Sequence, residues 1–185
     1  MFIVEIRERL EKSVAKIPRE WRGTKHEKWF LNNNASKGKI GTVCYKEYLE
    51  YLGYTVEIIS DRGDLRYRKK KTDPWRKAEV KTSKVDLKVL KSGSINEQLW
   101  FNQVRPEQGG WQEVVLVGIY PNHVRMWRMG REEFLNRRGV MNSTVKGLSH
   151  VGTDQLSQVT LKKNSKVDNF LEWELIHNDQ QGNLL

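Results

Sequence analysis

The chain has 185 residues, of which 30% are charged and 37% are hydrophobic, and this length suffices for one domain with a substantial core. Its 33 Lys and Arg residues outnumber its 23 Asp and Glu residues, which gives a formal net charge of +10 at pH 7. That excess favours a polyanionic partner, nucleic acid first. The single cysteine, Cys44, excludes an internal disulfide and a cysteine-based zinc cluster.

Hydrophobic periodicity predicts two helices before the first strand. Apolar residues spaced by three and four predict a helix over residues 1–17, which Pro18 ends. Residues 19–39 lack this periodicity, so we expect a loop or a short helix there. A second helix is predicted over residues 40–52, and Gly53 is well placed to end it. The residues expected on its buried side are Val43, Cys44, Tyr48, Leu49 and Leu52.

Three strands are predicted to follow as a meander, over residues 54–59, 65–68 and 76–82. They alternate in polarity and are separated by turn-forming residues at 60–63 and 73–74. Residues 112–120 form the most apolar stretch and are predicted to be a strand buried on both faces. The other elements expected are a loop over 83–94, a helix over 95–104, a strand over 123–129, a helix over 131–137, loops over 138–155, a strand over 156–162 and a helix over 167–176.

No internal repeat or linker divides the chain, so we expect a single domain over residues 1–185. No apolar run approaches the roughly 18 residues of a membrane span. The apolar N-terminal residues are interrupted early by the charged residues Glu5 and Arg7, whereas a signal peptide has a longer apolar segment. We therefore expect an intracellular, cytoplasmic protein with no membrane partner.

The chemistry centres on the third predicted strand, where Glu79 and Lys81 are two residues apart. Residues at this spacing in a strand project from the same face, whereas Val80 projects from the other. A carboxylate can hold a divalent metal, and a neighbouring ammonium can steady a nucleophilic water or an anionic transition state. This pair suits hydrolysis of a phosphodiester, although an ordinary solvated strand is the alternative reading.

A metal site of this kind needs carboxylates from at least two places in the chain. Asp64 stands at the start of the adjacent strand of the same predicted hairpin, which would bring it close to Glu79. Asp61, in the preceding turn, is a rival, and a simple turn-capping role for Asp64 is the alternative.

Basic residues cluster beside this pair and are expected to hold nucleic-acid phosphates in a salt-dependent way. They are Arg66, Arg68, Lys69, Lys70, Lys71, Arg76 and Lys77. Trp75 is expected to stack on a base or sugar. A second group is Arg125, Arg128, Arg131, Arg137 and Arg138, and Arg105 is a separate nucleic-acid-binding candidate. Some of these arginines are expected to read base edges, whereas the alternative for the first cluster is a solvated hairpin tip.

The order helix, strand, strand with Asp, strand with Glu-x-Lys, helix, strand resembles the PD-(D/E)XK nuclease superfamily, which includes the type II restriction endonucleases. The matching residues are Gly63-Asp64-Leu65 and Glu79-Val80-Lys81, and the resemblance covers roughly residues 38–129. It implies an α/β, restriction-endonuclease-like fold with a mixed central β-sheet flanked by helices. The sequence leaves open whether residues 138–185 are a DNA-recognition extension, a dimerisation extension or a part that completes the core.

The resemblance also implies roles for individual residues. Asp64, Glu79 and the Val80 carbonyl would bind Mg²⁺, as one ion or two, and Lys81 would contact the attacking water. Gln103, from the Gln-containing helix that follows, would fix that water or a phosphate oxygen. The sequence departs from the family where many relatives carry a glutamate early in the first helix, because Thr42 stands there. Either Glu47 replaces it or the site works without it.

We therefore expect a Mg²⁺-dependent endonuclease for double-stranded DNA, of the sequence-specific type II restriction kind and acting as a homodimer. A Holliday-junction resolvase or repair nuclease of the same fold is one alternative. A basic DNA-binding domain without catalysis, in which Glu79 and Lys81 form a surface ion pair, is another.

Overall fold

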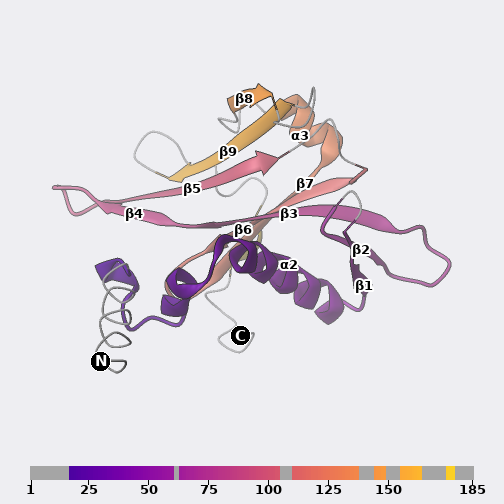
Figure 1. Ribbon diagram of the computed structural model, residues 1–185, viewed down its shortest axis with the longest axis horizontal. Helices are drawn as coiled ribbons and strands as arrows, with labels where there is room; N and C mark the ends of the chain where they lie inside the picture. The colour runs from indigo at the N-terminus through magenta and orange to yellow at the C-terminus, as the bar shows by residue number, and fades with distance from the viewer. Residues whose placement is uncertain are drawn as a thin grey trace, which may run out of the picture.

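The computed structural model describes residues 17–60, 63–104, 110–137, 144–148, 155–163 and 174–177. These residues form two β-sheets and a long helix, shown in Figure 1. The six-stranded sheet has the order β1-β2-β3-β6-β7-β10, and the four-stranded sheet has the order β4-β5-β9-β8. The predicted helix over 1–17 lies outside the described residues except for Ile17, which is buried.

The six-stranded sheet is mixed, because β3 and β6 are parallel while its other neighbouring strands are antiparallel. Its strands are β1 (Thr55–Ile58), β2 (Leu65–Arg68), β3 (Arg76–Lys84), β6 (Glu113–Ile119), β7 (Val124–Gly130) and β10 (Glu174–His177). The predicted α/β class with a mixed central sheet is confirmed, as is the meander of its first three strands. Every residue of β6 is buried, as the apolar run over residues 114–119 predicts for all but its first residue, Glu113.

Helix α2 (Asn34–Tyr51) covers one face of this sheet. It begins earlier than predicted because the Asn33 side chain accepts a hydrogen bond of 2.8 Å from the Ser36 N–H and caps the helix. Gly53, with φ of +82°, follows its end as predicted. Two short 3-10 helices, η1 (Arg19–Trp21) and η2 (Glu27–Leu31), precede it and bury Trp21 and Trp29.

The contact between Gly41 and Thr82 fixes the rotation of α2. A Cβ atom on Gly41 would lie 2.0 Å from the Thr82 Oγ1 atom, so the helix approaches β3 as closely as glycine permits. This rotation buries Cys44 and Leu49, as predicted, and leaves Tyr48 half-buried. The predicted burial of Val43 and Leu52 is wrong, because this rotation leaves both side chains exposed.

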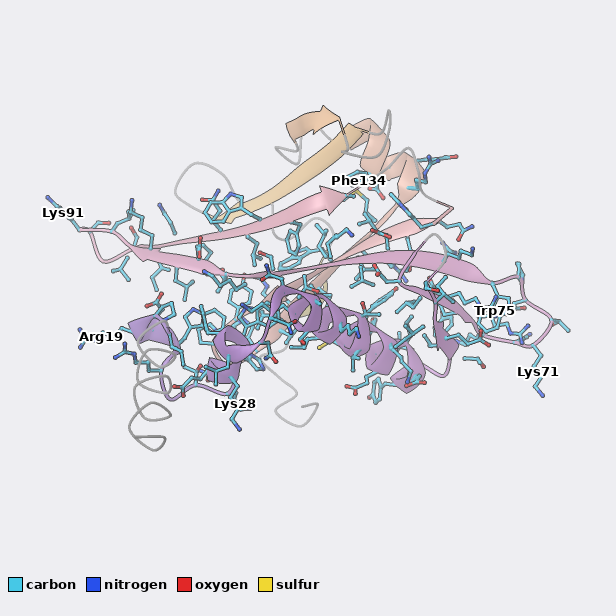
Figure 2. The ribbon with its side chains drawn as sticks, in the orientation of Figure 1. Arg19, Lys28, Lys71, Trp75, Lys91 and Phe134 are labelled. Carbon is cyan, nitrogen blue, oxygen red and sulfur yellow. The ribbon has the colours of Figure 1, made fainter. Side chains whose placement is uncertain are left out.

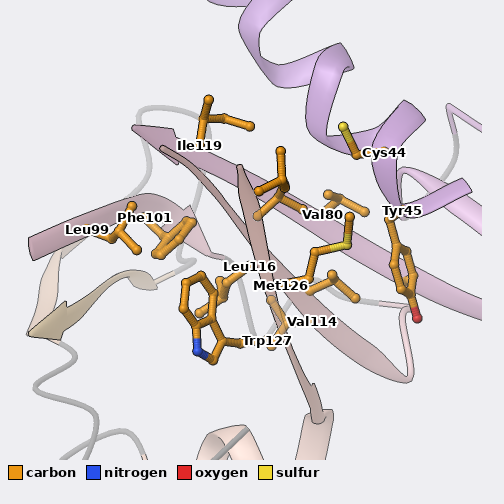
Figure 3. Packing of buried hydrophobic residues seen from close by; sticks show 14 of the residues in the cluster. Cys44, Tyr45, Val80, Leu99, Phe101, Val114, Leu116, Ile119, Met126 and Trp127 are labelled. Carbon is orange, nitrogen blue, oxygen red and sulfur yellow. The ribbon is translucent and has the colours of Figure 1, made fainter. Parts of the chain in front are cut away.

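The four-stranded sheet packs on the opposite face, and sequence patterning missed most of it. Its strands are β4 (Asp86–Val89), β5 (Ile95–Val104), β8 (Thr144–Leu148) and β9 (Gln155–Lys163). The predicted helix over 95–104 is therefore wrong, because these residues pair with β4 and β9. The predicted loop over 83–94 holds mainly at residues 90–94, since residues 83–84 end β3 and residues 86–89 form β4. Figure 3 shows Leu99 and Phe101 of β5 beside Trp127, across the sheet from Cys44 and Tyr45 of α2.

The end of the chain contributes strands to both sheets. Helix α3 (Arg131–Arg137) is confirmed, but β8 occupies part of the predicted loops over 138–155. Most of the predicted helix over 167–176 lies outside the described residues, and its last residues belong to strand β10 instead. A role for residues 138–185 in DNA recognition or dimerisation stays a prediction. Within the described ranges, no helix is long and apolar enough to cross a membrane.

Candidate active site

Glu79 and Lys81 lie together on the face of β3 that points away from α2. Side chains alternate along a strand, and the intervening positions pack toward the helix through Thr82. The Lys81 Nζ atom lies 2.5 Å from the Glu79 Oε1 atom, and the two side chains are 23% and 15% exposed. The charged pair is therefore preformed and only partly open to solvent.

Asp64 reaches the same strand from the residue that precedes β2. Its backbone N–H donates to the Ala78 carbonyl at 2.9 Å, and its Oδ2 atom accepts a hydrogen bond of 2.7 Å from the Val80 N–H. Gly63 turns the chain into this position with φ of +133°, a conformation that favours glycine. Because the N–H and C=O of one strand residue point the same way, the Val80 carbonyl faces the edge that Asp64 occupies.

The three charged groups influence one another. Burial raises the pKa of the Asp64 carboxyl, the hydrogen bond from Val80 lowers it, and the negative charge of Glu79 raises it further. The positive charge of Lys81 acts in the opposite direction. The net effect is a raised pKa, which means that the folded protein disfavours the ionised form of Asp64. A cation between the two carboxylates would stabilise that ionised form.

The donor set fits Mg²⁺. Two carboxylates and a backbone carbonyl are hard oxygen ligands, and Mg²⁺ usually keeps several waters beside only one or two carboxylates. No group of three or more His, Cys, Asp or Glu residues suited to a metal occurs among the described residues. A metal held by Asp64, Glu79 and the Val80 carbonyl would leave its other coordination positions to water and substrate.

The remaining predicted catalytic residues are placed less favourably. Glu47 is exposed on α2, where its charge acts on Cys44 and not on Asp64. Gln103 belongs to strand β5 rather than to a helix, so the resemblance that gave it a role does not hold in that respect. Asp61, the rival carboxylate, lies outside the described residues.

Strands β2 and β3 and the turn between them carry the first basic cluster and form one end of the molecule, where Figure 2 shows Lys71 and Trp75. Arg66 pairs with Lys77 across β2 and β3, on the face that carries Glu79. The guanidinium carbons of Arg66 and Arg68 lie 4.6 Å and 4.2 Å from the centre of the Trp75 ring. Three of the predicted nucleic-acid contacts therefore form one stacked unit on the same face as the candidate site.

The other residues of this cluster are dispersed. Lys69 lies over the Tyr54 ring, with its Nζ atom 5.4 Å from the ring centre, and Lys70 and Lys71 are exposed in the connecting turn. Arg76 lies on the α2 side of the sheet, 3.9 Å from Glu113.

The members of the second arginine group whose side chains the structure describes do not form a surface beside the site. Arg125 is only 5% exposed and lies 3.7 Å from Glu97 of β5. Arg128 is exposed, but it is paired with Val115 on the α2 side of the sheet. Arg131 begins α3 and contacts Trp111, while Arg105 and Arg138 lie outside the described residues. We therefore leave Arg125 and Arg128 out of the proposed DNA-contacting surface.

Sequence reasoning missed a buried carboxylate behind the site. Glu113 of β6 is 2% exposed and accepts hydrogen bonds from the Tyr45 and Tyr67 hydroxyls at 2.8 Å and 2.9 Å. Burial and the charge of Glu113 raise the pKa of Tyr67 to about 12. These bonds join α2 and β2 to the central strand, and the only signal in the sequence is a glutamate that opens a wholly apolar strand.

No protein-family model matches the sequence, and no curated protein matches it either. Among solved structures, a bacterial homing endonuclease is similar, with a TM-score of 0.43 and 17% sequence identity. The similarity covers 76% of this chain and 83% of that chain. This similarity is too distant to assign an activity to the chain.

Proposed function

We propose that this protein is a Mg²⁺-dependent endonuclease that hydrolyses phosphodiester bonds of double-stranded DNA. The observation that carries this proposal is the 2.7 Å hydrogen bond between the Asp64 carboxylate and the Val80 N–H. This hydrogen bond holds the Asp64 carboxylate at the edge of β3, the strand that carries the Glu79–Lys81 ion pair. The charges of Glu79 and Lys81 both act on Asp64.

Each residue then has a distinct role. Asp64, Glu79 and the Val80 carbonyl would hold the ion, which would supply an acidified water and neutralise phosphate charge. Lys81 presents its ammonium to the attacking water and the phosphate, and Glu79 keeps that ammonium in position at 2.5 Å. The basic side chains of Arg66, Arg68 and Lys77 hold the DNA backbone on the same face of the sheet as Glu79.

Cleavage of plasmid and phage DNA with and without Mg²⁺ tests this proposal directly. Glu79→Ala and Lys81→Ala should each abolish cleavage, because each removes one member of the site. Lys84→Ala is a matched control, since Lys84 is also on β3 and is also paired with an acid two residues away, Asp86. Cleavage that survives Glu79→Ala and Lys81→Ala would mean that the active site lies elsewhere.

The type of product separates the finer possibilities. Discrete fragments support the sequence-specific, type II restriction kind that we favour, whereas cleavage confined to four-way junctions or damaged duplexes supports a resolvase or repair nuclease. Salt-sensitive binding without any cleavage supports a non-catalytic DNA-binding domain. Cutting both strands at one site favours a homodimer, and light scattering of the protein with and without duplex DNA measures that state.

A further inference from the structure

Arg66, which pairs with Lys77 on the strand of the candidate site, is bound by an acidic residue. The Arg66 Nε and Nη2 atoms both donate to the Glu57 Oε2 atom, at 2.7 Å and 2.5 Å. The two residues face each other across β1 and β2, and their side chains are 38% exposed for Arg66 and 45% exposed for Glu57. An ion pair this open to solvent is weak, because water and salt screen it.

The neighbouring arginine has an unused donor. Its guanidinium is held from one side by the Trp75 ring, and the Arg68 Nη1 atom donates to the Lys71 carbonyl at 2.7 Å. The Arg68 Nε atom is shielded from solvent and has no hydrogen-bond partner within the part of the chain that the structure describes. A buried N–H without a partner is unfavourable, so an acceptor that reaches it stabilises the pair of arginines.

We propose that the Glu57 carboxylate occupies the position on Arg66 that a DNA phosphate takes in the complex. Once Glu57 is displaced, the surface formed by Arg66, Arg68 and Trp75 binds the phosphate backbone of duplex DNA. This inference rests on the proposed function. A guanidinium fork binds carboxylate and phosphate oxygens with the same geometry, and Trp75 keeps both forks in place before DNA arrives. Arg66 exchanges one anionic oxygen for another and loses no hydrogen bond.

The substitution Glu57→Gln tests the exchange, because it removes the competing charge and keeps the size of the side chain. We expect duplex DNA to bind about 2–5-fold more tightly, which is the range that loss of a solvent-exposed ion pair allows. The slope of log affinity against log salt should steepen by about 0.9, because one more protein cation then replaces a DNA counterion. Fluorescence anisotropy with labelled duplex in EDTA measures both quantities without cleavage.

Two controls separate this exchange from a general effect of charge. Glu50→Gln removes a similar exposed pair, with Lys46 on α2, on the other face of the sheet, and should leave DNA affinity unchanged. In an Arg66→Gln background, Glu57→Gln should no longer tighten binding, because the residue that Glu57 occupies is absent.

The outcomes distinguish the two proposals. An equal gain with and without Arg66 overturns the inference in favour of a general field effect, and no gain, or weaker binding, in Glu57→Gln overturns it outright. Glu57→Thr, which suits an edge strand, repeats the test if the glutamine variant unfolds at a lower temperature. Wild-type protein that binds no duplex DNA overturns the proposed function as well, whereas normal wild-type binding with no effect of Glu57→Gln overturns only this inference.

Discussion

The Asp64 carboxylate takes the place of a strand at the edge of β3. Strand β2 pairs with β3 from Tyr67 back to Leu65, and the next ladder donor, the Val80 N–H, is bound by the Asp64 side chain at 2.7 Å. The carboxylate therefore ends the β2–β3 pairing and lies beside the Val80 carbonyl. One residue both satisfies the backbone and supplies a ligand for a metal.

Asp64→Asn should separate these two roles. The amide oxygen still accepts from the Val80 N–H, but it supplies no charge to a cation. We expect cleavage to fall by roughly 10²-fold or more, the usual loss when one electrostatic contact of an active site is removed. In the absence of DNA, Mg²⁺ should raise the melting temperature of the wild type but not of the variant. An equal rise in both proteins would remove Asp64 from the metal site.

The same variant gives a pH-dependent prediction for metal-free protein. The pKa of Asp64 is raised above its ordinary value of 3.8, mainly by burial. Asp64 therefore favours the folded state when protonated, and this contribution is lost as pH rises through its pKa in the folded protein. The melting temperature of Asp64→Asn should exceed that of the wild type at pH 7, and the gap should close as pH falls toward 3.8. Thermal unfolding in EDTA across this range measures it, and a gap that widens toward low pH would contradict the raised pKa.

The candidate site could be predicted from the sequence because its residues lie on neighbouring strands that are close together in the chain. The turn before Asp64 and the alternating strands on either side specify a hairpin, and a hairpin brings Asp64 to Glu79 without help from distant residues. The unbroken apolar run of β6 likewise signals burial on both faces. Glu57 could also have been found, because in a meander its strand pairs with the one that carries Arg66.

The second sheet was not accessible in this way, because distant pairing determines it. The sequence of β5 has polar residues spaced in a way that also suits a helix, and only its pairing with β9, far along the chain, selects the strand. The burial of Arg125 depends on the same strand pairing, since its ion-pair partner Glu97 belongs to β5. The position of α2 depended on Gly41, whose close contact with Thr82 no periodicity reveals.

Gly41→Ala should therefore destabilise the protein. The new Cβ atom would lie 2.0 Å from the Thr82 Oγ1 atom, and such overpacking typically costs about 1–3 kcal/mol. Gly38→Ala on the same helix is the matched control, because nothing lies within 4 Å of its Cβ position and alanine favours helices. Urea unfolding measures both free energies. Adding Thr82→Ala to Gly41→Ala should recover part of the loss, and a Gly41→Ala variant as stable as Gly38→Ala would disprove the contact.

Tyr67→Phe should destabilise the protein by about 1.5–3 kcal/mol at neutral pH, because it removes a hydrogen bond to a buried charged carboxylate. Tyr48→Phe is the control, since the described residues give the Tyr48 hydroxyl no hydrogen bond and its ring also lies beside Tyr45, with 6.2 Å between the ring centres. The pKa of Tyr67 is raised from 10.0 to about 12. Its contribution to stability is therefore complete below pH 10 and is lost as pH rises toward 12. The difference in free energy of unfolding between wild type and Tyr67→Phe should shrink over that interval. A difference that stays constant to pH 12 would contradict the raised pKa of Tyr67.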